Sequence, residues 1–275
     1  MSEAVISSSS PAMPEVGIAD GRTTFPRRSI SVSQPVRGWQ RTESTLTQPT
    51  AIAVEQLGAV SRSAALTKRA IDVVGSILLL LVLSPVFVVI GLAIKMSDPS
   101  APVFYSHRRV GQGGRTIKVT KFRSMHDHFS TGDDAPFANA IEAYAAMGRH
   151  DLCEEFAQTH KVAADPRVTS IGGFLRRTSL DELPQIFCTL RGDLSLVGPR
   201  PITAEEVCKW GDGADALLTV KPGITGLWQV SGRSDTSFQQ RVEFDLFYVR
   251  QWSIWMDAKI LLRTIPAVLH RRGAY

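Results

Sequence analysis

The chain has 275 residues, with 31 basic and 26 acidic side chains and a net charge of +5. Its length suffices for one domain of ordinary size with tails, and so modest a charge does not by itself indicate nucleic acid, so we expect no nucleic-acid partner. Three widely spaced cysteines without a CxxC pair give no zinc-site pattern and favour a reducing compartment.

Residues 1–60 form the first predicted region, which is rich in Ser, Thr and Pro and has few large apolar side chains. A segment of this composition cannot bury enough apolar surface to offset the entropy that is lost on folding. We therefore expect it to be a disordered cytoplasmic tail.

An apolar membrane segment follows over residues 66–98. From Val73 to Ile94 it has 22 residues without a charge, enough for a helix to cross the hydrocarbon core of a bilayer. Ser84 and Pro85 lie in its middle, where a proline removes a helical hydrogen bond and kinks the chain. Basic residues flank both ends, although a simple crossing is expected to have one less basic end. The residues fit two topologies: a re-entrant helix that breaks at Ser84–Pro85 and returns to the cytoplasmic side, or a single crossing with a proline kink.

The remaining region, residues 99–275, is predicted to be a small cytoplasmic domain that is mostly α-helical. Residues 103–110 and 116–122 read as two strands of a β-hairpin around a glycine-rich turn. Residues 126–165 are polar and rich in alanine, and they read as an inserted helical excursion.

Two helices are predicted over residues 237–271 at the end of the chain. Their aromatic side chains fall roughly along one helical face, with basic residues nearby: Phe244, Phe247, Tyr248, Trp252, Trp255, Lys259 and Arg263. Such a face suits an amphipathic helix at the headgroup level of a bilayer, and it equally suits an ordinary core face. The neighbouring membrane segment favours interfacial helices.

Asp181 and Glu182 are the first candidates for chemistry. They precede a short amphipathic helical pattern, so they lie at a helix N-terminus, where acids commonly serve as caps. Ser179 and Glu182 match a capping box, although a helix start at Leu180 or Asp181 places Pro184 better. A helix N-terminus also favours phosphate, and Arg176 and Arg177 lie just upstream. An ionised carboxylate among anion-binding groups makes sense if Asp181 attacks phosphorus or if Mg²⁺ neutralises the charge.

Lys121 and Arg123 are the second candidates. On strand alternation both lie on the same side as Ile117 and Val119. Cations that continue an apolar face either extend along an edge towards water or point at a buried anion, and the sequence leaves both readings open.

Several motifs in order then carry a family resemblance. After the apolar segment with its central Ser-Pro come KFRSM (121–125), DPRVTSIGGFLRRTSLDELPQ (165–185), GDLSLVGPRP (192–201) and KPGITGLWQVSGR (221–233). Together with the C-terminal GAY, this set closely resembles the bacterial sugar transferases, which are monotopic polyprenyl-phosphate sugar-1-phosphate transferases. The resemblance covers about residues 66–275 and is closest to the short initiating galactose or glucose phosphotransferases of exopolysaccharide synthesis.

The resemblance implies a reaction and a place for it. A sugar-1-phosphate, with galactose or glucose as the leading choices, would pass from a UDP-sugar to undecaprenyl phosphate with release of UMP. The reaction would follow a two-step course through a covalent phosphosugar-enzyme. It would take place on the cytoplasmic face of the bacterial inner membrane, in contact with membrane lipid, and a homodimer is compatible with this arrangement.

The resemblance also implies roles for individual residues. Asp181 would be the nucleophile, and Glu182 would support catalysis and share the Mg²⁺ site with Asp181. The residues ascribed to phosphate and nucleotide-sugar binding are Lys121, Arg123, Arg176 and Arg200. Ser84 and Pro85 would form the break that makes the membrane helix re-entrant, and residues 99–275 would be the catalytic domain.

Two other classes of protein remain to be tested against this reading. A membrane-anchored scaffold or regulator of polysaccharide assembly would explain the anchor, the tail and the amphipathic helices. It would leave the cluster of acidic residues and arginines without a function. A phosphotransferase or hydrolase with a soluble substrate, merely tethered to the membrane, would act without a lipid acceptor.

Overall fold

The computed structural model describes residues 61–269 except 132–134, 160–161, 163, 212 and 233–235, together with two short strands near the N-terminus. These strands, β1 (Gly17–Ala19) and β2 (Arg22–Thr24), pair in an antiparallel manner. The other residues of the predicted tail over 1–60, and residues 270–275, lie outside the described part of the chain. Disorder of the tail therefore stays a prediction.

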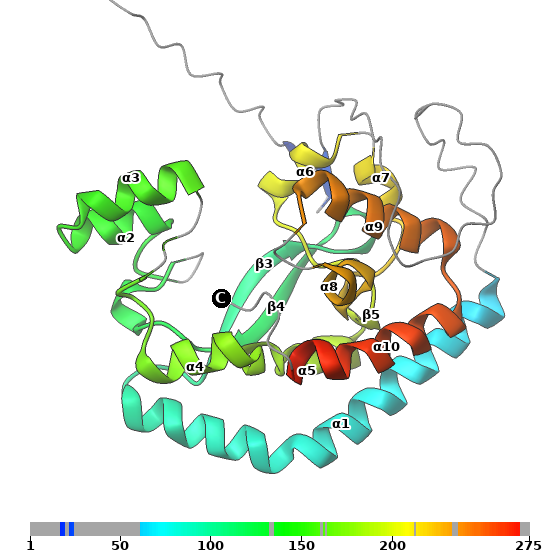
Figure 1. The fold of residues 1–275 in the computed structure, drawn as a ribbon, viewed down its shortest axis with the longest axis horizontal. Helices are drawn as coiled ribbons and strands as arrows, with labels where there is room; N and C mark the ends of the chain where they lie inside the picture. The colour runs from blue at the N-terminus through cyan, green and yellow to red at the C-terminus, as the bar shows by residue number, and fades with distance from the viewer. Residues whose placement is uncertain are drawn as a thin grey trace, which may run out of the picture.

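The described part of the chain is mostly helical, as predicted, and Figure 1 shows the helices around a small β-hairpin. The α-helices are α1 (Arg62–Ser97), α2 (Ala140–Ala146), α3 (His150–Thr159), α4 (Ser170–Thr178), α5 (Gln185–Arg191), α6 (Ala204–Trp210), α7 (Gly213–Leu217), α8 (Leu227–Ser231), α9 (Phe238–Gln251) and α10 (Ile254–Leu269).

The predicted hairpin is present as β3 (Phe104–Val110) and β4 (Thr116–Phe122). The two strands pair in an antiparallel manner, with Phe104 opposite Phe122 and Val110 opposite Thr116. On β4 the buried residues alternate with exposed ones over its first four positions, so one face of the hairpin packs against the core and carries every second side chain into it.

A second strand pair, β5 (Ser195–Val197) and β6 (Gly223–Thr225), is parallel and was not predicted. Each strand has three residues, so β6 is too short to give a recognisable alternation, and the residues of β5 are all buried and show none. The backbones are very close here: a Cβ on Gly223 would collide with the backbone of Gly198. This close approach explains why glycine occupies positions 198 and 223, and it fixes the loop that carries Arg200.

Helix α1 continues without interruption through Ser84 and Pro85. Figure 1 shows it bent near its middle, with its convex side away from the other helices. Pro85 has no N–H to give to the carbonyl of Leu81, four residues earlier, and the Ser84 hydroxyl donates to that carbonyl instead, at 2.9 Å. The predicted break is therefore a bend within a continuous helix, and the re-entrant topology stays a prediction.

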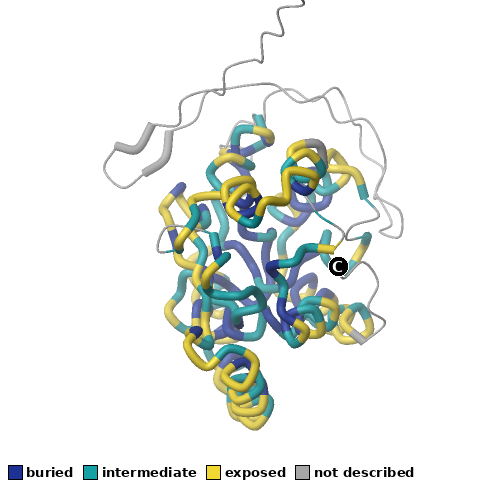
Figure 2. Tube along the Cα trace, turned by 90° about the vertical axis from the view of Figure 1, so that its left-hand side faces the viewer, coloured by how far each residue is buried: buried dark blue, intermediate teal, exposed yellow. Residues whose placement is uncertain are grey.

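The central part of α1 is largely exposed, as Figure 2 shows at the bottom of the molecule, and its exposed residues are mostly large and apolar. Within the described residues, α1 is the one helix long and apolar enough to cross a membrane, and only 11% of its most apolar 18-residue window is buried. The core helix of a soluble protein would be mostly buried. The exposed large side chains are Leu66, Ile71, Val74, Ile77, Leu78, Leu79, Leu81, Val82, Val88, Val89, Leu92 and Met96.

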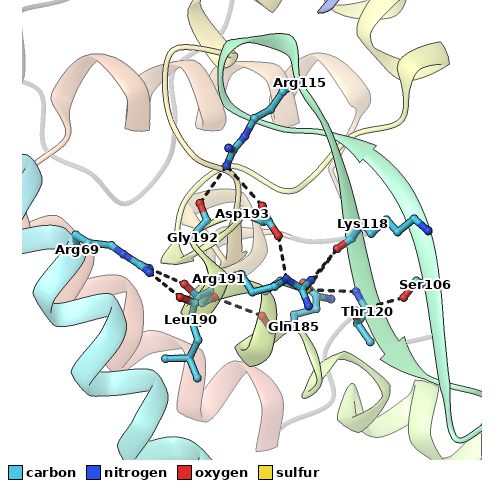
Figure 3. Close-up of polar contacts among 12 residues, drawn as sticks. Arg69, Ser106, Arg115, Lys118, Thr120, Gln185, Leu190, Arg191, Gly192 and Asp193 are labelled. Atoms are coloured by element: carbon cyan, nitrogen blue, oxygen red, sulfur yellow. Dashed lines mark hydrogen bonds and ion pairs between the residues drawn. The ribbon is translucent and has the colours of Figure 1, made fainter. Parts of the chain in front are cut away.

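Polar contacts fix the N-terminal half of α1 to the domain. Buried Asp72 accepts hydrogen bonds from the Ser195 hydroxyl at 2.9 Å and from the backbone N–H of Leu196 at 3.0 Å. Arg69 donates to the carbonyls of Thr189 and Leu190, both at 2.6 Å, at the C-terminal end of α5 (Figure 3). A cation at a helix C-terminus meets the negative end of its dipole, so this contact is electrostatically favourable.

The two C-terminal helices differ in their surroundings. Helix α9 is mainly a core helix, because its Phe244 and Tyr248 are buried in a cluster that also includes Leu227 and Ile260. Helix α10 contributes Ile260 to this cluster but exposes Trp255, and its Leu262 and Ile265 are also exposed. Of the two readings of the aromatic face, the core reading fits α9, and the interfacial reading fits the outer face of α10.

The predicted insertion contains the helices α2 and α3, which pack against each other at the left of Figure 1. They bury a small cluster of their own around Tyr144 and Leu152. Arg167 stacks on Tyr144, with 4.4 Å from its guanidinium carbon to the ring centre, and pairs with Asp165 at 2.7 Å. These contacts tie the returning chain to α2.

Candidate active site

The carboxylate pair lies between α4 and α5 in a tight turn. Helix α4 ends at Ser179, whose φ of 57° is left-handed and reverses the chain. Leu180–Glu182 then forms one 3₁₀ turn, and Pro184 precedes the first residue of α5. The expected capping box is absent, because the Ser179 side chain accepts no capping hydrogen bond. Asp181 and Glu182 are therefore available for other contacts.

Lys121 on β4 connects the two carboxylates. Its ammonium group lies 2.7 Å from Oε1 of Glu182 and 3.5 Å from Oδ2 of Asp181. This geometry decides between the two readings of the strand: Lys121 points at anions, and these are the protein's own carboxylates, buried Asp181 and half-buried Glu182.

Two of the predicted arginines approach the pair from different directions. The Nη1 atom of Arg200 lies 3.6 Å from Oε1 of Glu182. Arg176 donates to the Ser124 hydroxyl at 2.8 Å, and its positive charge acts on Asp181. The guanidinium groups thus lie near different members of the pair.

Arg123 is not brought to this cluster. Its Nη1 atom lies 2.6 Å from Asp127, and its Nε donates to the carbonyl of Pro102 at 2.9 Å. It also lies over the ring of Tyr105. The predicted role of Arg123 in phosphate binding therefore receives no support from its position.

The two carboxylates have opposite pKa shifts. Burial raises the pKa of Asp181, and the nearby charge of Lys121 offsets this only in part. Burial also acts to raise the pKa of Glu182, but the charges of Lys121 and Arg200 outweigh it and hold that pKa at about 2. Glu182 is thus a firmly ionised partner for the two cations, whereas the ionised form of Asp181 is less stabilised.

A polar cleft opens beside Glu182. Arg109, Lys121 and Arg200 line it, together with the amide side chains of Gln185 and Gln229. Sequence reasoning missed Arg109 and both glutamines.

For Arg109 a signal was present in the predicted hairpin. Arg109 is paired with Ile117, and cross-strand partners share one face of a sheet. Ile117, Val119 and Lys121 are on one face of β4, so the register alone places Arg109 on the face of Lys121.

The fold and the site together define a class of protein. A long apolar helix with an exposed surface lies under a small domain whose carboxylate pair is bordered by lysine and arginine. This is the arrangement expected of an enzyme that handles phosphorylated substrates at a membrane. Comparison with known protein families then matches residues 63–271 to the family described as bacterial sugar transferase. The chain belongs to this family.

Several curated proteins are similar over most of the chain. The "Exopolysaccharide production protein ExoY" of Sinorhizobium fredii is 42% identical over 221 residues, which are 80% of this chain and 93% of that protein. The "Undecaprenyl-phosphate galactose phosphotransferase" of Salmonella typhimurium is 43% identical over 216 residues, which are 78% of this chain and 43% of that protein. The "UDP-glucose:undecaprenyl-phosphate glucose-1-phosphate transferase" of Escherichia coli is 41% identical over 218 residues, which are 76% of this chain and 42% of that protein.

Proposed function

We propose that the protein transfers a sugar-1-phosphate from a UDP-sugar to undecaprenyl phosphate and releases UMP, as the first membrane step of exopolysaccharide assembly. The observation that carries this proposal is the pair Asp181–Glu182, held by Lys121 and bordered by Arg176 and Arg200. Family membership and the names of the relatives support the reaction class. Galactose and glucose are the sugars that these names contain, so they are the first substrates to test.

The transfer would proceed in two displacements at one phosphorus atom. A carboxylate oxygen of Asp181 attacks the phosphorus that bears the sugar, and the bond from this phosphorus to the bridging oxygen breaks, so that its electron pair leaves with UMP. An oxygen of undecaprenyl phosphate then attacks the same phosphorus. The bond to Asp181 breaks and the carboxylate is restored, leaving the sugar on a lipid diphosphate.

The residues around Asp181 suit this chemistry. Its ionised form is poorly stabilised by its surroundings, which favours a nucleophilic oxygen. Lys121 and Arg176 supply positive charge to a phosphate placed next to it, and each such contact is a charge-assisted hydrogen bond. Glu182 is ionised because of its low pKa, and its carboxylate holds Lys121 in position.

The carboxylate pair also fits a Mg²⁺ ion. Among the described residues, Lys121 contacts one oxygen of each carboxylate, so Oδ1 of Asp181 and Oε2 of Glu182 remain as oxygen ligands. Within the same residues no group of three or more acidic, His or Cys side chains is present, and Mg²⁺ in phosphoryl-transfer sites commonly takes one or two carboxylates plus substrate phosphates. Bound there, the ion would neutralise charge on the diphosphate.

We further infer a re-entrant α1 in the cytoplasmic leaflet of the bacterial inner membrane. The bend at Pro85, the basic flanks on both sides and the packing of both helix halves against the domain support it. This placement would bring a soluble nucleotide sugar and a lipid phosphate to one site.

The test is UMP release from a panel of UDP-sugars by the protein in nanodiscs with Mg²⁺, with and without undecaprenyl phosphate. Asp181→Asn should lower turnover at least about a thousandfold, as loss of a nucleophile does, while folding and membrane binding persist. Asp193→Asn is the matched control, because Asp193 pairs with Arg191 and Arg115 (Figure 3) and not with the cations that border the carboxylate pair. Full turnover by Asp181→Asn would refute the nucleophile assignment.

The same assay separates the alternatives. Turnover that needs the lipid establishes the transferase, and preference for one UDP-sugar identifies the donor. Hydrolysis of the nucleotide sugar without a lipid acceptor would indicate a tethered hydrolase. Folded protein that releases no UMP from any sugar would favour the scaffold.

A further inference from the structure

The polar cleft beside Glu182 is lined by more cations than carboxylates. Its lining has three cations, Arg109, Lys121 and Arg200, against the single carboxylate of Glu182. Lys121 and Arg200 both face that carboxylate, at 2.7 Å and 3.6 Å. Arg109 is therefore the cation of the cleft whose counter-ion lies elsewhere.

The counter-ion of Arg109 is Glu206, and Glu206 is shared. Its Oε2 atom lies 3.4 Å from Nη1 of Arg109 and also accepts the backbone N–H of Thr203 at 2.9 Å, in the capping box of α6. Its Oε1 atom lies 3.3 Å from Nη1 of Arg241. One carboxylate thus serves two guanidinium groups and a backbone donor, so it orients Arg109 without saturating it.

Donors of Arg109 remain for a ligand. A guanidinium carries five N–H bonds, and within the described residues the hydrogen bond of Arg109 is the one from Nη1 to Glu206. The positive charge of Arg200 is close enough to repel that of Arg109. An anion that entered the cleft between the two arginines would relieve this repulsion and accept hydrogen bonds from both.

We propose that Arg109, together with Arg200, binds the phosphate of the leaving nucleotide. This inference rests on the proposed function, which places the reacting phosphorus next to Asp181. The second phosphate of the diphosphate must lie one bridging oxygen away, and the cleft beside Glu182 opens at this point and is lined by the cations that would receive it. Negative charge builds up on this phosphate as the bond breaks, so Arg109 would also stabilise the transition state.

The test compares binding of UMP and of uridine to the full-length protein in nanodiscs. Arg109→Gln should weaken UMP binding by about ten- to a hundredfold, the effect of losing a charge-assisted contact, and should leave uridine binding unchanged. Arg109→Lys, which keeps the charge but loses the fork of donors, should fall in between. Arg108→Gln is the control, because Arg108 is the exposed neighbour on the other face of β3 and should bind UMP like the wild type.

A second experiment determines whether Arg109 binds the phosphate of the nucleotide or that of the lipid. In turnover assays Arg109→Gln should raise the KM for the UDP-sugar and leave the KM for undecaprenyl phosphate unchanged. A raised KM for the lipid with unchanged UMP affinity would assign Arg109 to the acceptor and overturn the proposal, as would equal UMP affinities of Arg109→Gln and wild type. UMP binding can be measured without turnover. An inactive wild-type protein would therefore refute the proposed reaction, and the UMP affinities would still test the role of Arg109.

Discussion

Asp181 and Glu182 are adjacent carboxylates whose pKa values are shifted in opposite directions. Glu182 lies near both Lys121 and Arg200, so it is held ionised with a pKa of about 2. Asp181 is 8% exposed and lies farther from Lys121, so burial decides the direction of its pKa shift. The adjacent pair was visible in the sequence. The difference between its members was not, because it depends on a lysine 60 residues away.

Asp245 on α9 provides a pH-dependent test of the buried charges. It is fully buried, and burial raises its pKa to about 7 although Arg241 lies 4.0 Å away. In the unfolded chain the same group loses its proton near pH 4. Between about pH 4 and about pH 7 the folded state therefore binds more protons, and the free energy of unfolding contributed by Asp245 decreases as the pH rises.

Asp245→Asn should remove this dependence. The variant cannot titrate at this position, so its free energy of unfolding should vary less steeply with pH than that of the wild type over the same window. Denaturant unfolding in detergent at several pH values measures the difference between the two slopes. Asp215→Asn, at an exposed position on α7, is the control and should keep the wild-type slope. An Asp245→Asn slope equal to that of the wild type would contradict the raised pKa.

At the scale of elements, the sequence predicted the strands and helices that a local residue pattern defines. The hairpin was placed within one residue, and the predicted membrane segment over 66–98 corresponds to α1 over Arg62–Ser97. The β5–β6 pair was missed because its strands are three residues long and stabilised by a parallel partner distant in the chain. Arg123 pairs with Asp127, four residues along the chain, and does not lie at the carboxylate pair, so its role in phosphate binding stays a prediction.

The prediction for a single element concerns Pro85, because the bend at this residue would decide whether α1 is re-entrant or crosses the bilayer. Pro85→Ala restores the N–H that pairs with the carbonyl of Leu81, so the helix can straighten and cross the bilayer. With an epitope tag at the N-terminus, protease added outside spheroplasts should leave the wild-type tag intact and digest a fraction of the variant. Val82→Ala, at an exposed position one turn earlier, is the control. Digestion of the wild-type tag from outside would exclude the re-entrant topology.

At the scale of the whole molecule, one carboxylate joins the apolar helix α1 to the C-terminal helices. Asp257 on α10 accepts a hydrogen bond from Lys68 on α1 at 2.6 Å, from Tyr248 at 2.8 Å and from Trp252 at 3.1 Å. Lys68 also donates to the carbonyl of Val197 on β5 at 3.0 Å. The contact therefore fixes the apolar helix relative to the strand pair that leads into the Arg200 loop.

Asp257→Asn should loosen this junction, because it leaves the half-buried Lys68 without its counter-ion and gives Tyr248 and Trp252 a poorer acceptor. Removing one partner of a buried ion pair costs about 3 kcal/mol, so we expect a loss of this size in the free energy of unfolding in nanodiscs. Lys68→Met in the same chain should recover part of the loss, since the two side chains interact directly and their effects are not additive. Lys95→Met, at the exposed far end of α1, is the control and should change stability by less than about 0.5 kcal/mol. Strictly additive losses from Lys68→Met and Asp257→Asn would show that the contact does not couple α1 to the domain.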